Sequence, residues 1–308
     1  MKVYQSIDEF KPLKRAVSTI GTFDGVHAGH QKIISRLCEL AKNEKGESVV
    51  LTFFPHPRMV LQPDDNNLKL LTTMSERIEL LKKLGVDHLI IQPFDKEFSR
   101  QSAVEFVRDI LVNKIGTKTL VIGYDHHFGR NREGSFKDLE EMSPIYGFRL
   151  EEIPKQEINE LAVSSTKIRN ALLTGDVMTA NSLLGHDFTL MGKVVDGDKI
   201  GRTLGFPTAN ISIAEQYKLI PASGIYAVLV KVGDQMLKGM LYIGYRPVVH
   251  GKSLSVEVNI FDFSQNIYNH DITVFLKARV RDDIHLSSLE ELRKKMIEDK
   301  LVATKLLA

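Results

Sequence analysis

The chain contains 308 residues, a length that suggests about two domains of roughly 100–200 residues each. Its 43% hydrophobic and 26% charged residues are ordinary for a globular protein, and the net charge of +2 carries no electrostatic signature of nucleic-acid or anionic-membrane binding. Cys38 is the only cysteine, which excludes an intrachain disulfide or a thiolate metal site. The start lacks the apolar core of a signal peptide, and no apolar run reaches the ~20 residues that span a bilayer. We therefore expect a cytoplasmic protein with no nucleic-acid or membrane partner.

Short apolar runs alternate with amphipathic stretches in the first half of the chain. The runs predict buried strands at residues 16–20, 49–53, 88–91 and 119–122. Between them, helical patterns cover residue 30 to about 42, 75–84, and 103 to about 112. Because strands separated by helices imply right-handed crossovers, this half is predicted to be a doubly wound α/β domain with a parallel sheet.

Two short helices are expected at the end of the first half, at residues 164–173 and 177–184, with Gly175 and Gly185 as their stop signals. The character of the chain changes from Phe188. Strand-like segments then follow one another with glycine turns between them, at residues 226–230, 240–243, 254–258 and 272–275. Such a series predicts a closed antiparallel barrel or sandwich. A final helix is expected from Ser287 to about Asp299, and it opens with an S-x-x-E capping box. We expect a domain boundary near residue 185, with domains at 1–185 and 186–308.

A glycine-containing turn follows the first predicted strand of this first half. It reads G-T-F-D-G-V-H-A-G-H from Gly21 to His30 and leads into a helix. Gly25 and Gly29 allow backbone to approach phosphate, while His27 and His30 can donate hydrogen bonds to phosphate oxygens. Taken alone, the H-x-G-H spacing fits a metal pair or two surface histidines equally well.

A string of hydroxyl and basic residues lies further along, at the start of the predicted helix 164–173. It comprises Ser164, Ser165 and Thr166, with Lys167 and Arg169 available for a triphosphate. An ordinary helix cap explains one of these hydroxyls but not the whole string.

The H-x-G-H turn paired with S-S-T-x-I-R resembles the nucleotidylyltransferase superfamily. The fuller string G-T-F-D-G-V-H-x-G-H resembles one branch of it, the bacterial bifunctional riboflavin kinase/FMN adenylyltransferases. The resemblance implies a Rossmann-like domain in which His27, His30 and Arg169 are catalytic. It also implies an ATP site made of Gly21, Phe23, Asp24, Gly25, His27, Gly29, His30, Ser164, Ser165, Thr166 and Arg169.

Two more segments are similar to that branch. One is T-F-F-P-H-P at residues 52–57, and the other is G-Y-D-H-H-F-G at residues 123–129, in which His126 replaces the usual phenylalanine. They imply a flavin site made of Phe54, Pro55, His56, Asp125 and Phe128.

A second candidate phosphate-binding segment lies in the β-rich half, at residues 197–210. Residues 197–203 superficially match a Walker A loop, but the spacing is one residue short and Arg202 stands in place of lysine. In G-R-T-L-G-F-P-T-A-N, from Gly201 to Asn210, Thr208 and Asn210 are two apart. On an extended segment their side chains face the same way and can share a Mg²⁺–phosphate unit. The alternative is an ordinary turn followed by a strand.

The order of motifs in this half resembles the riboflavin kinase module. G-R-T-L-G-F-P-T-A-N is followed by P-A-S-G-I-Y-A at 221–227, I-G-Y-R-P at 243–247 and V-E-V-N-I-F-D-F at 256–263. The resemblance implies a six-stranded antiparallel barrel in which Thr208 and Asn210 hold Mg-ATP and Glu257 is the general base. The implied ATP and magnesium residues are Gly201, Thr203, Gly205, Pro207, Thr208 and Asn210.

Three positions depart from that pattern. Val248 stands where threonine is usual, Asn259 stands where histidine is common, and Asn269-His270 replaces a Y-G pair. These departures concern flavin contacts and the kinase rate more than the type of reaction.

The expected function is therefore bifunctional flavin-cofactor synthesis. The barrel converts riboflavin and ATP to FMN and ADP, and the α/β domain converts FMN and ATP to FAD and pyrophosphate, with Mg²⁺ carried in by the nucleotide. One rival is an adenylyltransferase for another acceptor, which predicts no P-T-A-N and V-E pairing. The other rival is a non-enzymatic flavin- or RNA-binding module. It gives no role to Glu257 or to the H-x-G-H turn. No oligomeric state is specified.

Overall fold

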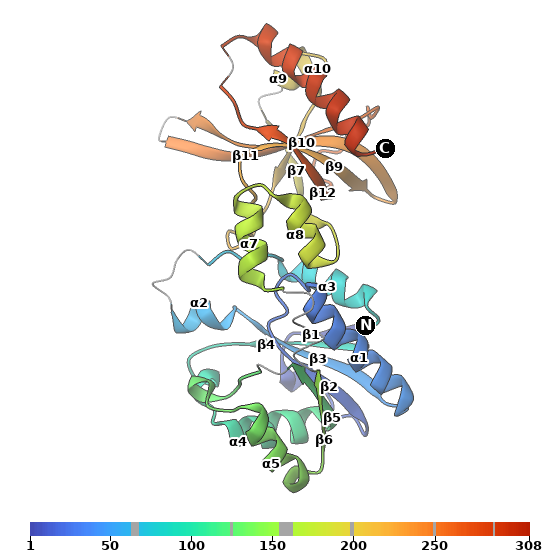
Figure 1. Cartoon of the computed structure of the whole chain (residues 1–308), viewed down its shortest axis with the longest axis vertical. Helices are drawn as coiled ribbons and strands as arrows, with labels where there is room; N and C mark the ends of the chain where they lie inside the picture. The colour runs from blue at the N-terminus through green and yellow to red at the C-terminus, as the bar shows by residue number, and fades with distance from the viewer. Residues whose placement is uncertain (63–67, 124–125, 154–162, 198–199, 249–250, 286) are drawn as a thin grey trace. The chain divides into compact units, whose positions relative to one another are not determined.

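The computed structural model describes residues 1–62, 68–123, 126–153, 163–197, 200–248, 251–285 and 287–308. The chain divides into two compact units (Figure 1). The first comprises Met1–Leu70 with Met74–Val163, and the second comprises Leu71–Thr73 with Ser164–Ala308. The two helices expected before residue 185 therefore pack with the second unit.

The first unit is built on a six-stranded parallel sheet with the order β1-β4-β3-β2-β5-β6. Its strands are β1 (Lys2–Tyr4), β2 (Ala16–Ile20), β3 (Glu47–Phe54), β4 (His88–Pro93), β5 (Thr117–Gly123) and β6 (Arg149–Ile153). The four predicted strands are confirmed. β1 and β6 at the two edges were not predicted, because these edge strands are short and lack a continuous apolar run.

Helices cover both faces of this sheet, as the doubly wound prediction requires. They are α1 (Ala28–Asn43), α2 (Pro57–Leu61), α3 (Met74–Lys83), α4 (Ala103–Glu105), which continues as the π-helix η3 (Phe106–Ile115), and α5 (Phe136–Tyr146). Alternate residues of β3 enter different cores: Val50 packs with α1 and α3, whereas Val49 and Leu51 pack with η3 and α5. Burial on both faces explains why the strands are almost uniformly apolar.

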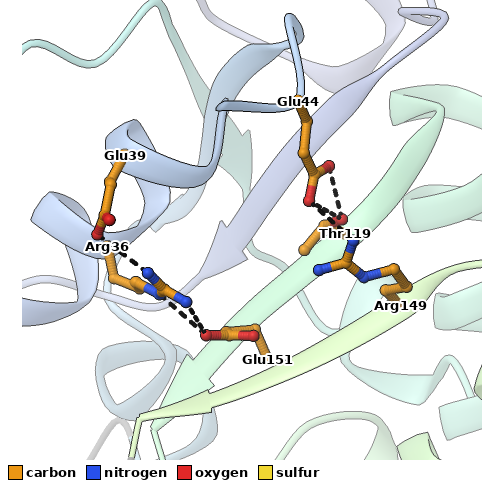
Figure 2. Close-up of polar contacts among 6 residues, drawn as sticks. All are labelled: Arg36, Glu39, Glu44, Thr119, Arg149 and Glu151. Atoms are coloured by element: carbon orange, nitrogen blue, oxygen red, sulfur yellow. Dashed lines mark hydrogen bonds and ion pairs between the residues drawn. The ribbon is translucent and has the colours of Figure 1, made fainter. Parts of the chain in front are cut away.

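A polar network on the first unit joins α1 to the strand pair β5–β6 (Figure 2). Arg36 of α1 pairs with Glu151 of β6 at 2.6 Å and with Glu39 at 3.0 Å. Directly after the helix, the Glu44 carboxylate accepts a 2.9 Å hydrogen bond from Thr119 of β5. These contacts fix the helix that begins at the H-x-G-H turn.

The second unit contains a closed antiparallel barrel, which decides between the barrel and the sandwich (Figure 1). The strand order is β10-β11-β8-β7-β12-β9. The bounds are β7 (Phe188–Val195), β8 (Ala209–Ser212), β9 (Gly224–Val232), β10 (Gln235–Val248), β11 (Gly251–Ile260) and β12 (Asp271–Asp282). The helices of this unit are α7 (Ser165–Leu173), α8 (Val177–Leu184), the single turn α9 (Ile200–Thr203) and α10 (Leu289–Leu306).

The C-terminal helix differs in detail from its prediction. The N-cap of this helix is Ser288, whose hydroxyl accepts a hydrogen bond from the Glu291 N–H. The capping box predicted at Ser287 and Glu290 is therefore wrong by one residue. The helix also runs past Asp299 to Leu306. Tertiary contacts account for the extension, since Ala303, one turn beyond Asp299, is fully buried in a cluster with Met240 and Phe261 of the barrel unit.

Candidate active sites

Three candidate segments of the first unit follow the carboxyl ends of neighbouring strands. The H-x-G-H turn follows β2, T-F-F-P-H-P ends β3, and the 123–129 segment follows β5. The strand order reverses direction at β2, with β3 on one side and β5 on the other. This edge of a doubly wound sheet is where such folds bind ligands.

The turn between β2 and α1 is tightly constrained. Phe23, Gly25 and Val26 have positive φ angles of 48°, 84° and 41°. Positive φ is rare for a β-branched residue such as valine, and strain of this kind clusters at functional sites. A side chain at Gly21 would meet the Phe23 ring at 3.1 Å, so glycine there lets the ring fold back on the turn.

The two histidines of the turn are organised by the start of α1. His27 is the N-cap, and its Nδ1 accepts a 3.3 Å hydrogen bond from the His30 N–H. A neutral His27 that accepts at Nδ1 carries its proton on Nε2, where it can donate. The two rings stack with centroids 3.6 Å apart at 15°, so they do not converge on one point as a metal pair does.

His30 is held neutral by its surroundings. Burial, the neighbouring His27 and the Arg77 guanidinium lower the pKa of His30 well below its usual value. In the part of the chain that the structure describes, Nδ1 of His30 is buried and has no hydrogen-bond partner. Orphan buried polar atoms of this kind are uncommon away from functional sites.

Asp24 of the turn belongs to a buried ion pair whose other member, Arg77, was not predicted. The carboxylate of Asp24 and the guanidinium of Arg77 in α3 are 3.8 Å apart, with side chains 2% and 1% exposed. Arg77 could have been noticed, because it shares a helix face with Leu81 and Leu84 at spacings of four and seven. A charge on an apolar face requires a specific partner.

The described residues among those expected to bind flavin lie at this same sheet edge. Phe54 ends β3 and joins Pro55 through a cis peptide bond, and His56 caps α2 by accepting from the Arg58 N–H. Phe128 is buried, and the His126 ring stacks parallel to it at 6.0 Å. Asp125 lies outside the described residues.

The S-S-T-x-I-R string belongs to the second unit. Ser164 is the N-cap of α7, with its hydroxyl accepting from the Lys167 N–H at 3.2 Å. Ser165, Thr166 and Arg169 follow within the first two turns of the helix. The ordinary cap interpretation is therefore correct for Ser164, and the remaining residues need another explanation.

In the barrel, Glu257 is the centre of a buried polar cluster. It lies in β11, is 6% exposed, and is paired with Asn210 of β8 in the strand register. Its Oε2 accepts a 3.1 Å hydrogen bond from the Thr208 hydroxyl, and its Oε1 accepts a 2.6 Å bond from Ser255. The structure thus joins the P-T-A-N and V-E motifs, which are about fifty residues apart. Ser255 was not recognised in the sequence.

The segment before β8 is shaped by its glycines and by Asn259. The Phe206 N–H donates to the Gly201 carbonyl at 2.8 Å, and a side chain at Gly201 would collide with the Phe206 carbonyl oxygen. Gly205 has a φ of 86°. The Asn259 amide donates a 2.7 Å hydrogen bond to the Pro207 carbonyl. Thr203 ends the short helix α9.

A cavity of about 480 Å³ opens beside this segment. Its walls include Arg202, Pro207, Thr208 and the loop 263–268. Glu257 is not among the lining residues and lies behind Thr208, to which it is bonded. Tyr268 also lines the cavity, and Asn269 has a φ of 65°, a conformation that asparagine tolerates well. The side chain of Val248 lies outside the description.

These features define a two-unit transferase. A parallel sheet carries the H-x-G-H turn at its carboxyl edge, and a closed barrel carries a buried carboxylate close to a cavity. Residues 10–167 match the FAD synthetase family and residues 184–307 match the riboflavin kinase family. The chain belongs to the bifunctional riboflavin kinase/FMN adenylyltransferase family.

Relatives of that description cover nearly the whole chain. The protein of Escherichia coli K12 is 35% identical over 98% of this chain and 97% of its own length. The protein of Pseudomonas fluorescens is 36% identical over 100% and 98%. A solved Streptococcus pneumoniae structure, described as a macrolide-efflux protein, aligns with a TM-score of 0.87 at 30% identity, covering 98% of both chains. Among the described residues, no helix is both long and apolar enough to cross a membrane.

Proposed function

We propose that the barrel transfers the γ-phosphoryl group of ATP to riboflavin with Glu257 as the general base, and that the sheet unit transfers an adenylyl group from a second ATP to the resulting FMN. The observation that carries this proposal is the Glu257 carboxylate, buried in β11 and bonded to Thr208 of the P-T-A-N segment beside a cavity. The single cysteine suits a reducing compartment, and we place both reactions in the cytoplasm.

In the kinase reaction, the primary hydroxyl of the riboflavin side chain attacks the γ-phosphorus of ATP. Oε2 of Glu257 accepts the hydroxyl proton as the new O–P bond forms and ADP departs. For this step the Thr208 hydroxyl turns from Oε2 toward the nucleotide. Thr208 and Asn210 offer neutral oxygen ligands, which suit Mg²⁺ held chiefly by phosphates and water. When bound, the ion neutralises charge on the phosphates.

In the adenylyl reaction, a phosphate oxygen of FMN attacks the α-phosphorus of ATP, and pyrophosphate departs. The nucleophile is already anionic, so no general base is needed. The Nε2–H of His27 is oriented to donate to a phosphate oxygen, because Nδ1 is engaged at the helix N-terminus. His30 donates to the triphosphate as a neutral ring.

The test is a paired assay of Glu257→Gln. Glutamine keeps the shape of the side chain but cannot take the proton, so riboflavin-to-FMN conversion should fall by roughly 10²–10⁴-fold. FMN-to-FAD conversion should stay near normal in the same preparation and serves as the control for folding. An unchanged first rate would remove Glu257 from the mechanism and make the barrel a flavin-binding module.

A further inference from the structure

Three polar side chains of β11 occupy alternate positions on the strand. Ser255, Glu257 and Asn259 are two residues apart, so they share one face. All three are buried, at 9%, 6% and 5% exposure. Polar groups are buried at a free-energy penalty unless they are hydrogen-bonded, and each of these three takes part in a hydrogen bond.

The two hydroxyl groups bonded to Glu257 have different settings. Thr208 precedes β8 and lines the cavity, so its hydroxyl is available to a ligand. Ser255 does not line the cavity, and its backbone is fixed by the pairing of β11 with β10, where it faces Gly244. Ser255 also makes the shorter bond to the carboxylate, at 2.6 Å against 3.1 Å.

This difference matters if Glu257 acts as the base. Its Oε2 must exchange the Thr208 hydroxyl for the hydroxyl of the substrate, and during that exchange the carboxylate loses one of its donors. Hydrogen bonds to a charged group are roughly twice as strong as neutral ones, so the bond from Ser255 is well suited to hold the carboxylate in its rotamer.

We infer that Ser255 is a positioning residue of the kinase: it holds Oε1 of Glu257 while Oε2 exchanges Thr208 for the substrate hydroxyl. The inference rests on the proposed role of Glu257 as the base. Ser255 acts entirely through that carboxylate and touches neither ATP nor riboflavin.

Two kinetic consequences follow. Ser255→Ala should lower the kcat of FMN formation about tenfold, as expected for loss of one hydrogen bond to a charged group. The KM values for riboflavin and ATP should change less than about twofold, because Ser255 does not line the cavity. If Ser255→Ala instead destabilised the barrel as a whole, the KM values would rise while kcat fell.

The decisive experiment is a double-mutant cycle on the full chain. FMN formation is measured for the parent protein, Ser255→Ala, Glu257→Gln and the double variant. Ser212→Ala is the matched control, since Ser212 is exposed on the adjoining strand β8. FMN adenylylation and the melting temperature are recorded for every variant. The double variant should be as slow as Glu257→Gln alone, because Ser255 has no effect once the base is gone.

Two results would overturn the inference without touching the proposed function. One is a parent-like kcat for Ser255→Ala while Glu257→Gln is slow. The other is a further tenfold loss in the double variant, which would show that Ser255 acts independently of Glu257. A parent-like rate for Glu257→Gln would instead overturn the proposed base and this inference with it.

Discussion

The side-chain amide of Asn259 donates a 2.7 Å hydrogen bond to the carbonyl oxygen of Pro207. A buried residue of β11 thereby holds the segment that carries Thr208 toward the cavity. The contact shows what a polar side chain at this position can do.

Replacing Asn259 with alanine should therefore weaken nucleotide binding. We expect the KM for ATP in FMN formation to rise about tenfold, because the Pro207 carbonyl loses its partner and the 207–210 segment is less ordered. Asn259→His should keep most of the affinity, since a ring N–H can also donate. Steady-state kinetics with varied ATP will check this; an unchanged KM for the alanine variant would contradict it.

His27 offers a way to separate its two roles. His27→Asn retains a good N-cap acceptor for α1 but removes the Nε2–H that we assign to a phosphate oxygen. FAD formation should fall by about 10²–10³-fold, as when a single donor to transition-state charge is removed. FMN formation by the same preparation should be unchanged. Equal loss of both activities in a folded protein would show that the two reactions do not have separate sites.

The environment of His30 predicts a pH dependence of stability. Burial keeps this ring neutral in the folded state, whereas an unfolded histidine takes up a proton below a pKa of about 6.5. The unfolded state then binds more protons, so the free energy of unfolding should fall as the pH drops below about 6.5, by up to about 1.4 kcal/mol per pH unit. Above that range, His30 contributes no pH dependence.

His30→Gln removes this titration and provides the comparison. Urea unfolding of the sheet unit, followed at pH 5, 6 and 8, should show a shallower acid dependence for the variant than for the parent. Identical pH dependence in the two proteins would mean that His30 has the same pKa in the folded and the unfolded state.

The contacts of α7 and α8 predict where the kinase unit must begin. Asn181 of α8 donates to the Leu276 carbonyl and accepts from the Phe188 N–H, both at 2.8 Å, and the Ala222 N–H donates to the carbonyl of Leu172 in α7. A fragment of 186–308, which follows the boundary expected near residue 185, lacks these contacts. A fragment of 164–308 keeps them.

Both fragments should phosphorylate riboflavin, but the shorter one should melt about 10 °C lower. That shift corresponds to a loss of about 3 kcal/mol in the free energy of unfolding for a unit of this size. Calorimetry of the two fragments, with FMN formation as the readout of the native site, makes the comparison. Equal melting temperatures would show that α7 and α8 do not stabilise the barrel.

The sequence by itself determined the class of each half of the chain. Apolar runs separated by amphipathic stretches predict a parallel sheet, and strands without intervening helices predict an antiparallel barrel or sandwich, because side-chain periodicity reflects which faces are buried. The H-x-G-H turn was likewise visible from residue type and local spacing, whereas Glu257 was singled out only by the resemblance of its V-E string to the riboflavin kinase module. The edge strands β1 and β6 were not visible, because half-exposed strands carry little periodic signal.

Tertiary structure alone decided which distant residues meet. Strand alternation places Ser255 and Glu257 on one face, but the pairing of Glu257 with Asn210 depends on the register between β11 and β8. The same holds for Arg77 beneath Asp24 and for Asn259 against Pro207. Register and helix docking result from closing the barrel and packing two cores, which are sums of many weak contacts between segments far apart in the chain.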